Sequence, residues 1–248
     1  MLRYICMIAV LVLVAPGTLA HAITLGQVDT FSSGLEDWWG YSSYQVLPDG
    51  GPAGAGDAYF YNVSTSDGGW LTVGNTSDRW KGDYTAAGVT ALQVDLVNLG
   101  SSALQVRAYL SGVIVDTSGH RQGGGFVSTI PFELPPDAEW YRVTFHVTAA
   151  DLTWIPNSLN GNVEAALRSV NTISFRHQVN ISDGGSGTPT MGSWGLDNIT
   201  AVPEPASFMM LAVTTAMLRR RGDGGATAPI LYNVNRGKGG LGRGDKVR

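Results

Sequence analysis

Short segments in which apolar and polar side chains alternate recur along most of the chain, and they constrain its fold more than any other feature. In Ala91–Val97 the polar residues Gln93 and Asp95 alternate with apolar ones. Leu104–Leu110 repeats the pattern with Gln105 and Arg107, both expected to face outward. A period of two is typical of a half-buried β-strand. Together with aromatic and β-branched runs, it predicts strands at 58–63, 69–73, 91–97, 104–110, 140–147, 172–179 and 193–200.

Turn signals separate these segments, and a helical pattern is rare. Pro48–Gly51, Ser66–Gly69 and Asp183–Gly185 combine Asp with Gly, which is typical of tight turns. One short helix is expected at Asn162–Ser169, with Leu167 and Val170 facing the core. Many short strands with a single helix predict an all-β protein, an antiparallel β-sandwich of the jelly-roll type.

The N-terminus has the layout of a secretory signal peptide over residues 1–22. A positive charge at Arg3 precedes an apolar run from Ile5 to Val14, and Ala20 and Ala22 supply the small residues that signal peptidase reads. The run is too short to span a bilayer. We therefore expect an N-terminal signal helix, export, and a mature chain that begins near Ile23.

The mature chain has no thiol, because the single cysteine, Cys6, lies in this signal. Disulfides, cysteine-ligated zinc and a cysteine nucleophile are thereby excluded. Residues 23–201 carry 17 acidic and 7 basic side chains, a net charge near −10. Such a body repels nucleic acid, whose binding depends on neutralising phosphates. Its length suits one β-sandwich domain over 23–201.

The composition changes after Ala201. The motif Pro203, Glu204, Pro205 is followed by the apolar segment Phe208–Leu218. Three arginines close that segment, namely Arg219, Arg220 and Arg221. Residues 222–248 are basic and rich in glycine, which is typical of a disordered tail.

Residues 202–221 resemble the PEP-CTERM sorting signal of Gram-negative bacteria. The three matching parts follow one another in the same order: the Pro-Glu-Pro motif, the apolar segment and the arginine cluster. The resemblance implies recognition by an exosortase, a membrane protease that cleaves near the Pro-Glu-Pro motif. It also implies a short apolar transmembrane helix that anchors the chain in the inner membrane until processing, with the arginines as the cytosolic stop. The protein is then expected at the cell envelope, the cell surface or in the extracellular matrix.

The body resembles laminin B and carbohydrate-binding jelly-roll domains. The resemblance rests on short matches at 29–31, 38, 80–84, 140–142 and 195–199. It implies a structural calcium ion held by Asp29 and Asp197, with further oxygens from loop carbonyls. Ligand chemistry alone fits equally well with both aspartates being turn or cap residues.

Aromatic residues are concentrated in the first third of the body. Large aromatic side chains usually lie in the core, which we expect for Trp38 and Trp70. The segment containing Trp39, Tyr41 and Tyr44 could instead line a concave face and stack on sugar rings.

No motif of nucleophilic, zinc-dependent or phosphate-binding catalysis occurs in the sequence. The first hypothesis is therefore a non-catalytic, exported protein that contacts polysaccharide or acts in adhesion. Two alternatives stay open, a secreted carbohydrate-active enzyme and a purely structural envelope protein. A groove with two carboxylates about 5 to 10 Å apart would favour the enzyme.

Overall fold

A computed structural model describes residues 22–115, 118, 120–156 and 162–203. The predicted signal helix, Ala20, Glu204, Pro205, the apolar segment, the three arginines and the tail 222–248 lie outside this range. Within it, Ala22 is exposed and Pro203 directly follows the last strand. No helix in the part of the chain that the structure describes is long and apolar enough to cross a membrane.

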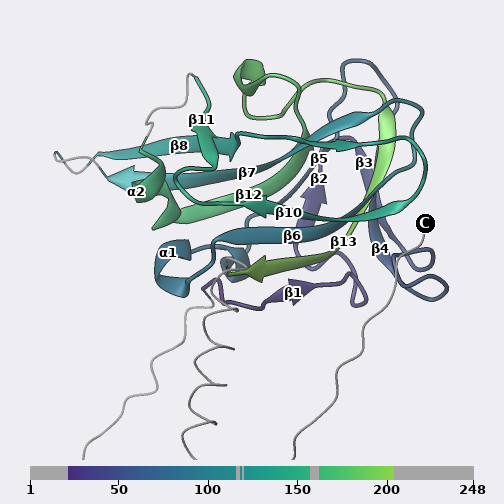
Figure 1. The fold of residues 1–248 in the computed structure, drawn as a ribbon, viewed down its shortest axis with the longest axis horizontal. Helices are drawn as coiled ribbons and strands as arrows, with labels where there is room; N and C mark the ends of the chain where they lie inside the picture. The colour runs from purple at the N-terminus through teal and green to yellow at the C-terminus, as the bar shows by residue number, and fades with distance from the viewer. Residues whose placement is uncertain (1–21, 116–117, 119, 157–161, 204–248) are drawn as a thin grey trace, which may run out of the picture. The chain divides into compact units, whose positions relative to one another are not determined.

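The described residues form two antiparallel sheets (Figure 1). Sheet A has the strand order β10-β6-β13-β4-β3, with β1 paired to β13. Its strands are β1 (Val28–Asp29), β3 (Ser43–Leu47), β4 (Tyr59–Ser64), β6 (Ala91–Asn98), β10 (Trp140–His146) and β13 (Gly192–Val202).

Sheet B has the order β11-β8-β7-β12-β5-β2, with β9 paired to β7. Its strands are β2 (Trp38–Gly40), β5 (Thr72–Asn75), β7 (Leu104–Val115), β8 (Arg121–Ser128), β9 (Phe132–Leu134), β11 (Leu152–Trp154) and β12 (Val170–His177). Short helices connect the strands: η1 (Asp78–Trp80), α1 (Tyr84–Ala87), α2 (Val163–Leu167) and η2 (Ile181–Asp183).

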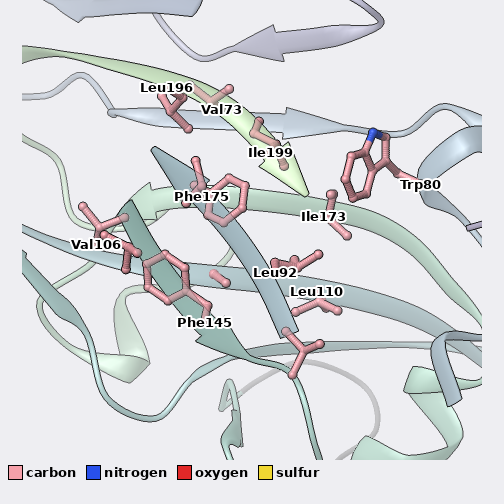
Figure 2. Close-up of a cluster of buried hydrophobic side chains, with 14 of the residues drawn as sticks. Val73, Trp80, Leu92, Val106, Leu110, Phe145, Ile173, Phe175, Leu196 and Ile199 are labelled. Atoms are coloured by element: carbon pink, nitrogen blue, oxygen red, sulfur yellow. The ribbon is translucent and has the colours of Figure 1, made fainter. Parts of the chain in front are cut away.

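The core lies between the inner faces of the two sheets (Figure 2). Leu92 and Leu196 come from sheet A, and Val106, Ile173 and Phe175 from sheet B; all are buried. Alternation along the strands produces this layer. In β10, for example, Val143 and Phe145 are buried, and the alternating residues Arg142, Thr144 and His146 are exposed. Full burial of such a side chain contributes about 1.5–3 kcal/mol.

The predicted all-β antiparallel sandwich is confirmed, and every predicted strand overlaps an observed one. The predicted helix is α2, whose N-cap Asn162 accepts a hydrogen bond from the Ala165 amide at 2.9 Å. Leu167 and Val170 are buried, as expected. Arg107 lies on the outer face of sheet B, as expected, but it is buried there, and its guanidinium donates to the Ser128, Thr129 and Gln178 carbonyls.

Candidate functional site

Three partly exposed aromatic rings, Trp39, Tyr41 and Trp70, lie in a continuous row that we call the aromatic surface. The ring centroids of Trp39 and Tyr41 are 5.3 Å apart, and those of Tyr41 and Trp70 are 6.0 Å apart. Tyr41 is 41% exposed and Trp70 is 36% exposed. Rings that contact one another yet remain open to solvent form an apolar patch, and such patches mark binding surfaces.

The strand register places this row on the outer face of sheet B. Trp38 pairs with Asn75 and points into the core, so Trp39, which pairs with Gly74, points the opposite way. Gly74 supplies the space for the indole. A Cβ atom at this position would lie 2.6 Å from Cζ2 of Trp39. The missing side chain therefore lets the indole lie directly on the backbone of β5.

Four hydrogen bonds hold the segment 41–43, which carries Tyr41. The buried Asn62 amide donates to the carbonyls of Tyr41, at 2.7 Å, and Ser43, at 3.0 Å, while its oxygen accepts from the Trp194 indole at 3.0 Å. The Tyr41 N–H donates to the Thr72 carbonyl at 3.0 Å. Ser42 Oγ donates to the Trp70 carbonyl at 3.3 Å. The backbone that carries Tyr41 is thus held to both sheets before any ligand arrives.

A buried guanidinium lies on the same face of sheet B. Arg176 belongs to β12, and its guanidinium carbon lies 4.1 Å from the centroid of the Tyr109 ring. Its Nε donates to Gln178 Oε1 at 2.8 Å and its Nη1 to the Gly185 carbonyl. Burial lowers the pKa of Arg176 to about 10, so it remains a cation at neutral pH. The segment around Gly185 covers it.

The predicted trio of Trp39, Tyr41 and Tyr44 is only partly brought together. Trp39 and Tyr41 are neighbours, but Tyr44 lies on β3 of sheet A and stacks on the buried Phe60 ring, 5.6 Å between centroids. The chain crosses from one sheet to the other at Ser42, which has a φ of 64°. Trp38 is buried, as predicted, whereas the core prediction for Trp70 was wrong.

Asp29 is buried and serves as the acceptor for two core tryptophans. Its Oδ2 accepts from the indole N–H of Trp38 at 2.8 Å and of Trp80 at 2.6 Å. Its Oδ1 lies 2.7 Å from the Arg79 guanidinium. The guanidinium balances the charge of Asp29, and Oδ1 makes this ion pair without a hydrogen bond. The calcium role expected for Asp29 stays a prediction.

Asp197 lies on the outer face of sheet A, directly opposite Asp95 in the strand register. We call these two residues the carboxylate pair. Asn198 Nδ2 donates to both of them, at 3.1 Å to Asp197 and 2.8 Å to Asp95. Burial, together with the nearby Asp57, Asp95 and Glu36, raises the pKa of Asp197 to about 7. Asp95 instead makes a bidentate ion pair with Arg142, 2.8 Å for each contact.

Two neighbouring carboxyl groups are what glycoside hydrolysis requires. Both members of the carboxylate pair are buried, however, and neither lines any of the three cavities described for this domain. Oδ1 of Asp197 is buried and lacks a hydrogen-bond partner, which is compatible with a proton or a cation there. Across the described residues, no group of three or more acidic, histidine or cysteine side chains is arranged to hold a metal ion.

Comparisons with known proteins give resemblances between structures only. No protein-family model matches the sequence, and no curated protein matches it. A family 11 carbohydrate-binding module from Clostridium thermocellum, solved with a β-1,3-1,4-mixed-linked tetrasaccharide, is 15% identical with a TM-score of 0.46, over 73% of this chain and 97% of that one.

Two further solved structures are similar at the same level. A xylan-binding domain of family 22 from Paenibacillus barcinonensis is 13% identical with a TM-score of 0.39, over 73% of this chain and 99% of that one. An exo-β-agarase is 13% identical with a TM-score of 0.48, over 73% of this chain and 26% of that one. At such low sequence identity, no role of a residue in these structures can be carried over to a residue of this chain.

Proposed function

We propose that this protein is a non-catalytic polysaccharide-binding protein and that the aromatic surface is its binding face. The observation that supports the proposal is the row formed by Trp39, Tyr41 and Trp70, which stays open to solvent on the outer face of sheet B. Large aromatic side chains are costly to leave exposed, so a contiguous exposed set indicates a partner. Pyranose rings present flat C–H faces that match such rings.

The chemistry of this face favours a neutral polysaccharide. No carboxylate belongs to the row, and the neighbouring Arg176 is buried rather than offered to solvent. The body as a whole carries a net charge near −10, which repels polyanions. Because hydrogen bonds with the Asn62 amide, the Thr72 carbonyl and the Ser42 hydroxyl already fix the backbone under the rings, little conformational entropy is lost on binding.

The test is titration of the full chain with soluble neutral polysaccharides, including mixed-linked β-glucan, xylan and agarose oligosaccharides, by calorimetry. Trp39→Ala and Trp70→Ala should each weaken binding at least tenfold. Trp154→Ala is the matched control, because Trp154 is 40% exposed on β11 and lies outside the row. Binding that is equally sensitive to Trp154→Ala would refute this face. Absence of binding to any neutral glycan would favour the purely structural alternative.

The enzymatic alternative depends on the carboxylate pair. Glycoside hydrolysis requires two carboxylates that reach the substrate, and the two here are buried, one of them ion-paired with Arg142. We therefore favour binding over catalysis. Release of reducing ends from the same polysaccharides, abolished by Asp197→Asn, would reverse that choice.

We also propose export and sorting through the two terminal signals. Support comes from the sequence motifs and from the end of β13 at Val202, directly before Pro203. Replacement of Pro203, Glu204 and Pro205 by alanine should leave export intact and block processing by an exosortase. The size and membrane fraction of the mutant and the natural chain, compared in a host with that enzyme, test the proposal. Identical behaviour would reject it.

We further propose a structural calcium ion held by Asp29 and Asp197. A bound ion would use the unpartnered Oδ1 of Asp197, with carbonyl oxygens completing its shell, and would add stability as far as it prefers the folded state. Chelator should then lower the melting temperature of the natural chain and not that of Asp197→Ala. No effect of chelator on the natural chain would end the proposal.

A further inference from the structure

The turn between β4 and β5 carries an aspartate directly before a glycine, Asp67-Gly68. Both residues are exposed, and the Gly69 N–H closes the turn by donating to the Ser66 carbonyl at 3.0 Å. Within the described part of the chain, the Asp67 carboxylate accepts no hydrogen bond and the Gly68 N–H donates none. A Cβ atom at Gly68 would meet nothing within 4 Å. The carboxyl carbon of Asp67 and the nitrogen that follows it are therefore both free to react with each other.

Two other aspartates of the described residues also precede glycine, and the fold holds the carboxylate of each. Asp49 Oδ1 accepts from the Gly56 N–H at 2.6 Å. Asp183 Oδ2 accepts from the Asn180 N–H at 2.9 Å and from the Thr188 hydroxyl. Neither carboxylate can turn toward the nitrogen of its own following glycine without losing these bonds. The turn between β4 and β5 lacks such a restraint.

We propose that Asp67 is a site of spontaneous isoaspartate formation. The Gly68 nitrogen attacks Cγ of Asp67, so that an N–Cγ bond forms, the Cγ–OH bond breaks, and the amide proton leaves with the hydroxyl as water. Water then opens the five-membered succinimide ring. Cleavage at the main-chain carbonyl of Asp67 yields isoaspartate, and cleavage at Cγ restores aspartate. Glycine favours ring closure because it has no Cβ to hinder the approach.

The isomer adds one methylene to the main chain of this turn, next to the aromatic surface. Gly69 packs closely on β4, since a Cβ atom built there would clash with Ser64 Oγ. Its carbonyl accepts from the Thr190 N–H at 2.8 Å, and the next residue is Trp70. The added length therefore acts on the residue that carries the Trp70 ring. We expect the isomer to loosen the contact of this ring with Tyr41, 6.0 Å between centroids.

The experiment is incubation of the full chain in neutral buffer at 37 °C for several weeks. Peptide mapping, with a fragmentation method that distinguishes isoaspartate from aspartate, then measures each site separately. Asp67→Glu is the matched control, because it keeps the charge and closes the corresponding larger ring far more slowly. Gly68→Ala keeps the aspartate and has room for its methyl group, which hinders the attack. Asp49 and Asp183 are internal references in the same digest.

We expect isoaspartate at position 67 to rise to at least five times its level at positions 49 and 183. Gly68→Ala should slow its formation several-fold, and Asp67→Glu should form none at this position. In the aged natural chain, the indole N–H signal of Trp70 in two-dimensional NMR should shift, and the glycan affinity should fall. The aged Asp67→Glu variant should keep both. The affinity readout depends on the proposed function, whereas the peptide map and the Trp70 signal do not, so a failure of either proposal is recognised separately.

Two results would overturn the assignment of the site. The first is no isoaspartate at position 67 after incubation. The second is an equal level at positions 49, 67 and 183, because the hydrogen bonds would then not select the site. The link to the aromatic surface would be refuted if the isomer forms and leaves the Trp70 signal unchanged. It would also be refuted if the aged Asp67→Glu variant shows the same shift.

Discussion

Trp38 and Trp39 are adjacent in the sequence and have opposite environments. Trp38 is 2% exposed, packs edge-to-face on Trp80 and donates its N–H to Asp29. Trp39 lies on the other face of sheet B, on the backbone of Gly74, beside the exposed Tyr41 ring. The buried aromatic cluster stabilises the fold, and the aromatic surface uses the same residue types for contact with a partner. The two groups should therefore respond differently to substitution.

The largest effect is expected at Asp29, the acceptor shared by the buried tryptophans. Asp29→Ala leaves two buried indole N–H groups unsatisfied, each at a cost of about 1–3 kcal/mol, and deprives Arg79 of its partner. Chemical denaturation should show a large loss in the free energy of unfolding. Asp67→Ala removes the same charge from an exposed turn and should change it little. Similar stability of the two variants would contradict the central role of Asp29.

Asn62 connects the buried cluster and the aromatic surface, so it should affect both. Asn62→Leu leaves the Trp194 N–H without an acceptor, at a cost of about 1–3 kcal/mol, and frees the carbonyls of Tyr41 and Ser43. We expect lower stability in denaturant titrations and, at temperatures where the variant is folded, weaker binding of neutral glycans. Unchanged glycan affinity in the folded variant would show that Asn62 does not position Tyr41.

Substitution of Gly74 should lower glycan affinity while it leaves the stability of the fold nearly unchanged. In Gly74→Ala the new methyl group meets the Trp39 indole, which must lift from the strand. Glycan affinity should fall several-fold, while the free energy of unfolding changes by less than about 1 kcal/mol. Gly123→Ala, at a strand position with open space around it, is the control. If Gly123→Ala weakens glycan binding to the same degree, the packing of the Trp39 indole on the backbone of Gly74 is not what positions the aromatic surface.

The smallest effect concerns pH. Burial lowers the pKa of His177 below its ordinary value of 6.5, and its Nδ1 accepts from the Gln105 N–H at 3.0 Å. The unfolded chain therefore binds the proton more readily, so the stability due to neutral His177 is present above pH 6.5 and is lost as the pH falls below it.

His177→Asn keeps an acceptor and removes the titration. Between pH 7.5 and pH 5 the natural chain should lose slightly more stability than this variant, as followed by thermal melts. Glycan affinity should stay constant over the same range, because no imidazole or carboxylate belongs to the aromatic surface. If the melting temperatures of the natural chain and of His177→Asn fall equally between pH 7.5 and pH 5, His177 is not the cause of the pH dependence.

The strands were predictable where the segment was long enough to show its period. Leu104–Leu110 and Trp140–Val147 alternate over seven or eight residues, and β7 and β10 occupy these positions. β2 has three residues and β1 has two, which is too short for any pattern. The prediction that Trp70 is buried failed because Trp70 lies on the same side of the chain as Thr72 and Gly74. Val73 lies on the opposite side, which faces the core.

The grouping of site residues failed for a related reason. Trp39, Tyr41 and Tyr44 are close in sequence, but the turn at Ser42 sends the chain from sheet B to sheet A. Trp70 joins the first two through the pairing of β2 with β5, a contact between residues about thirty positions apart.

The sequence by itself determined the all-β class, the position of the longer strands and the helix at α2, because backbone periodicity and capping act over a few neighbouring residues. Only the tertiary structure decided which tryptophans are buried, which rings meet on the outer face of sheet B, and that Asp29 binds two indoles. Those outcomes depend on strand register and sheet assignment. A shift of one residue turns every side chain to the opposite face, and no local pattern fixes it in strands of two or three residues.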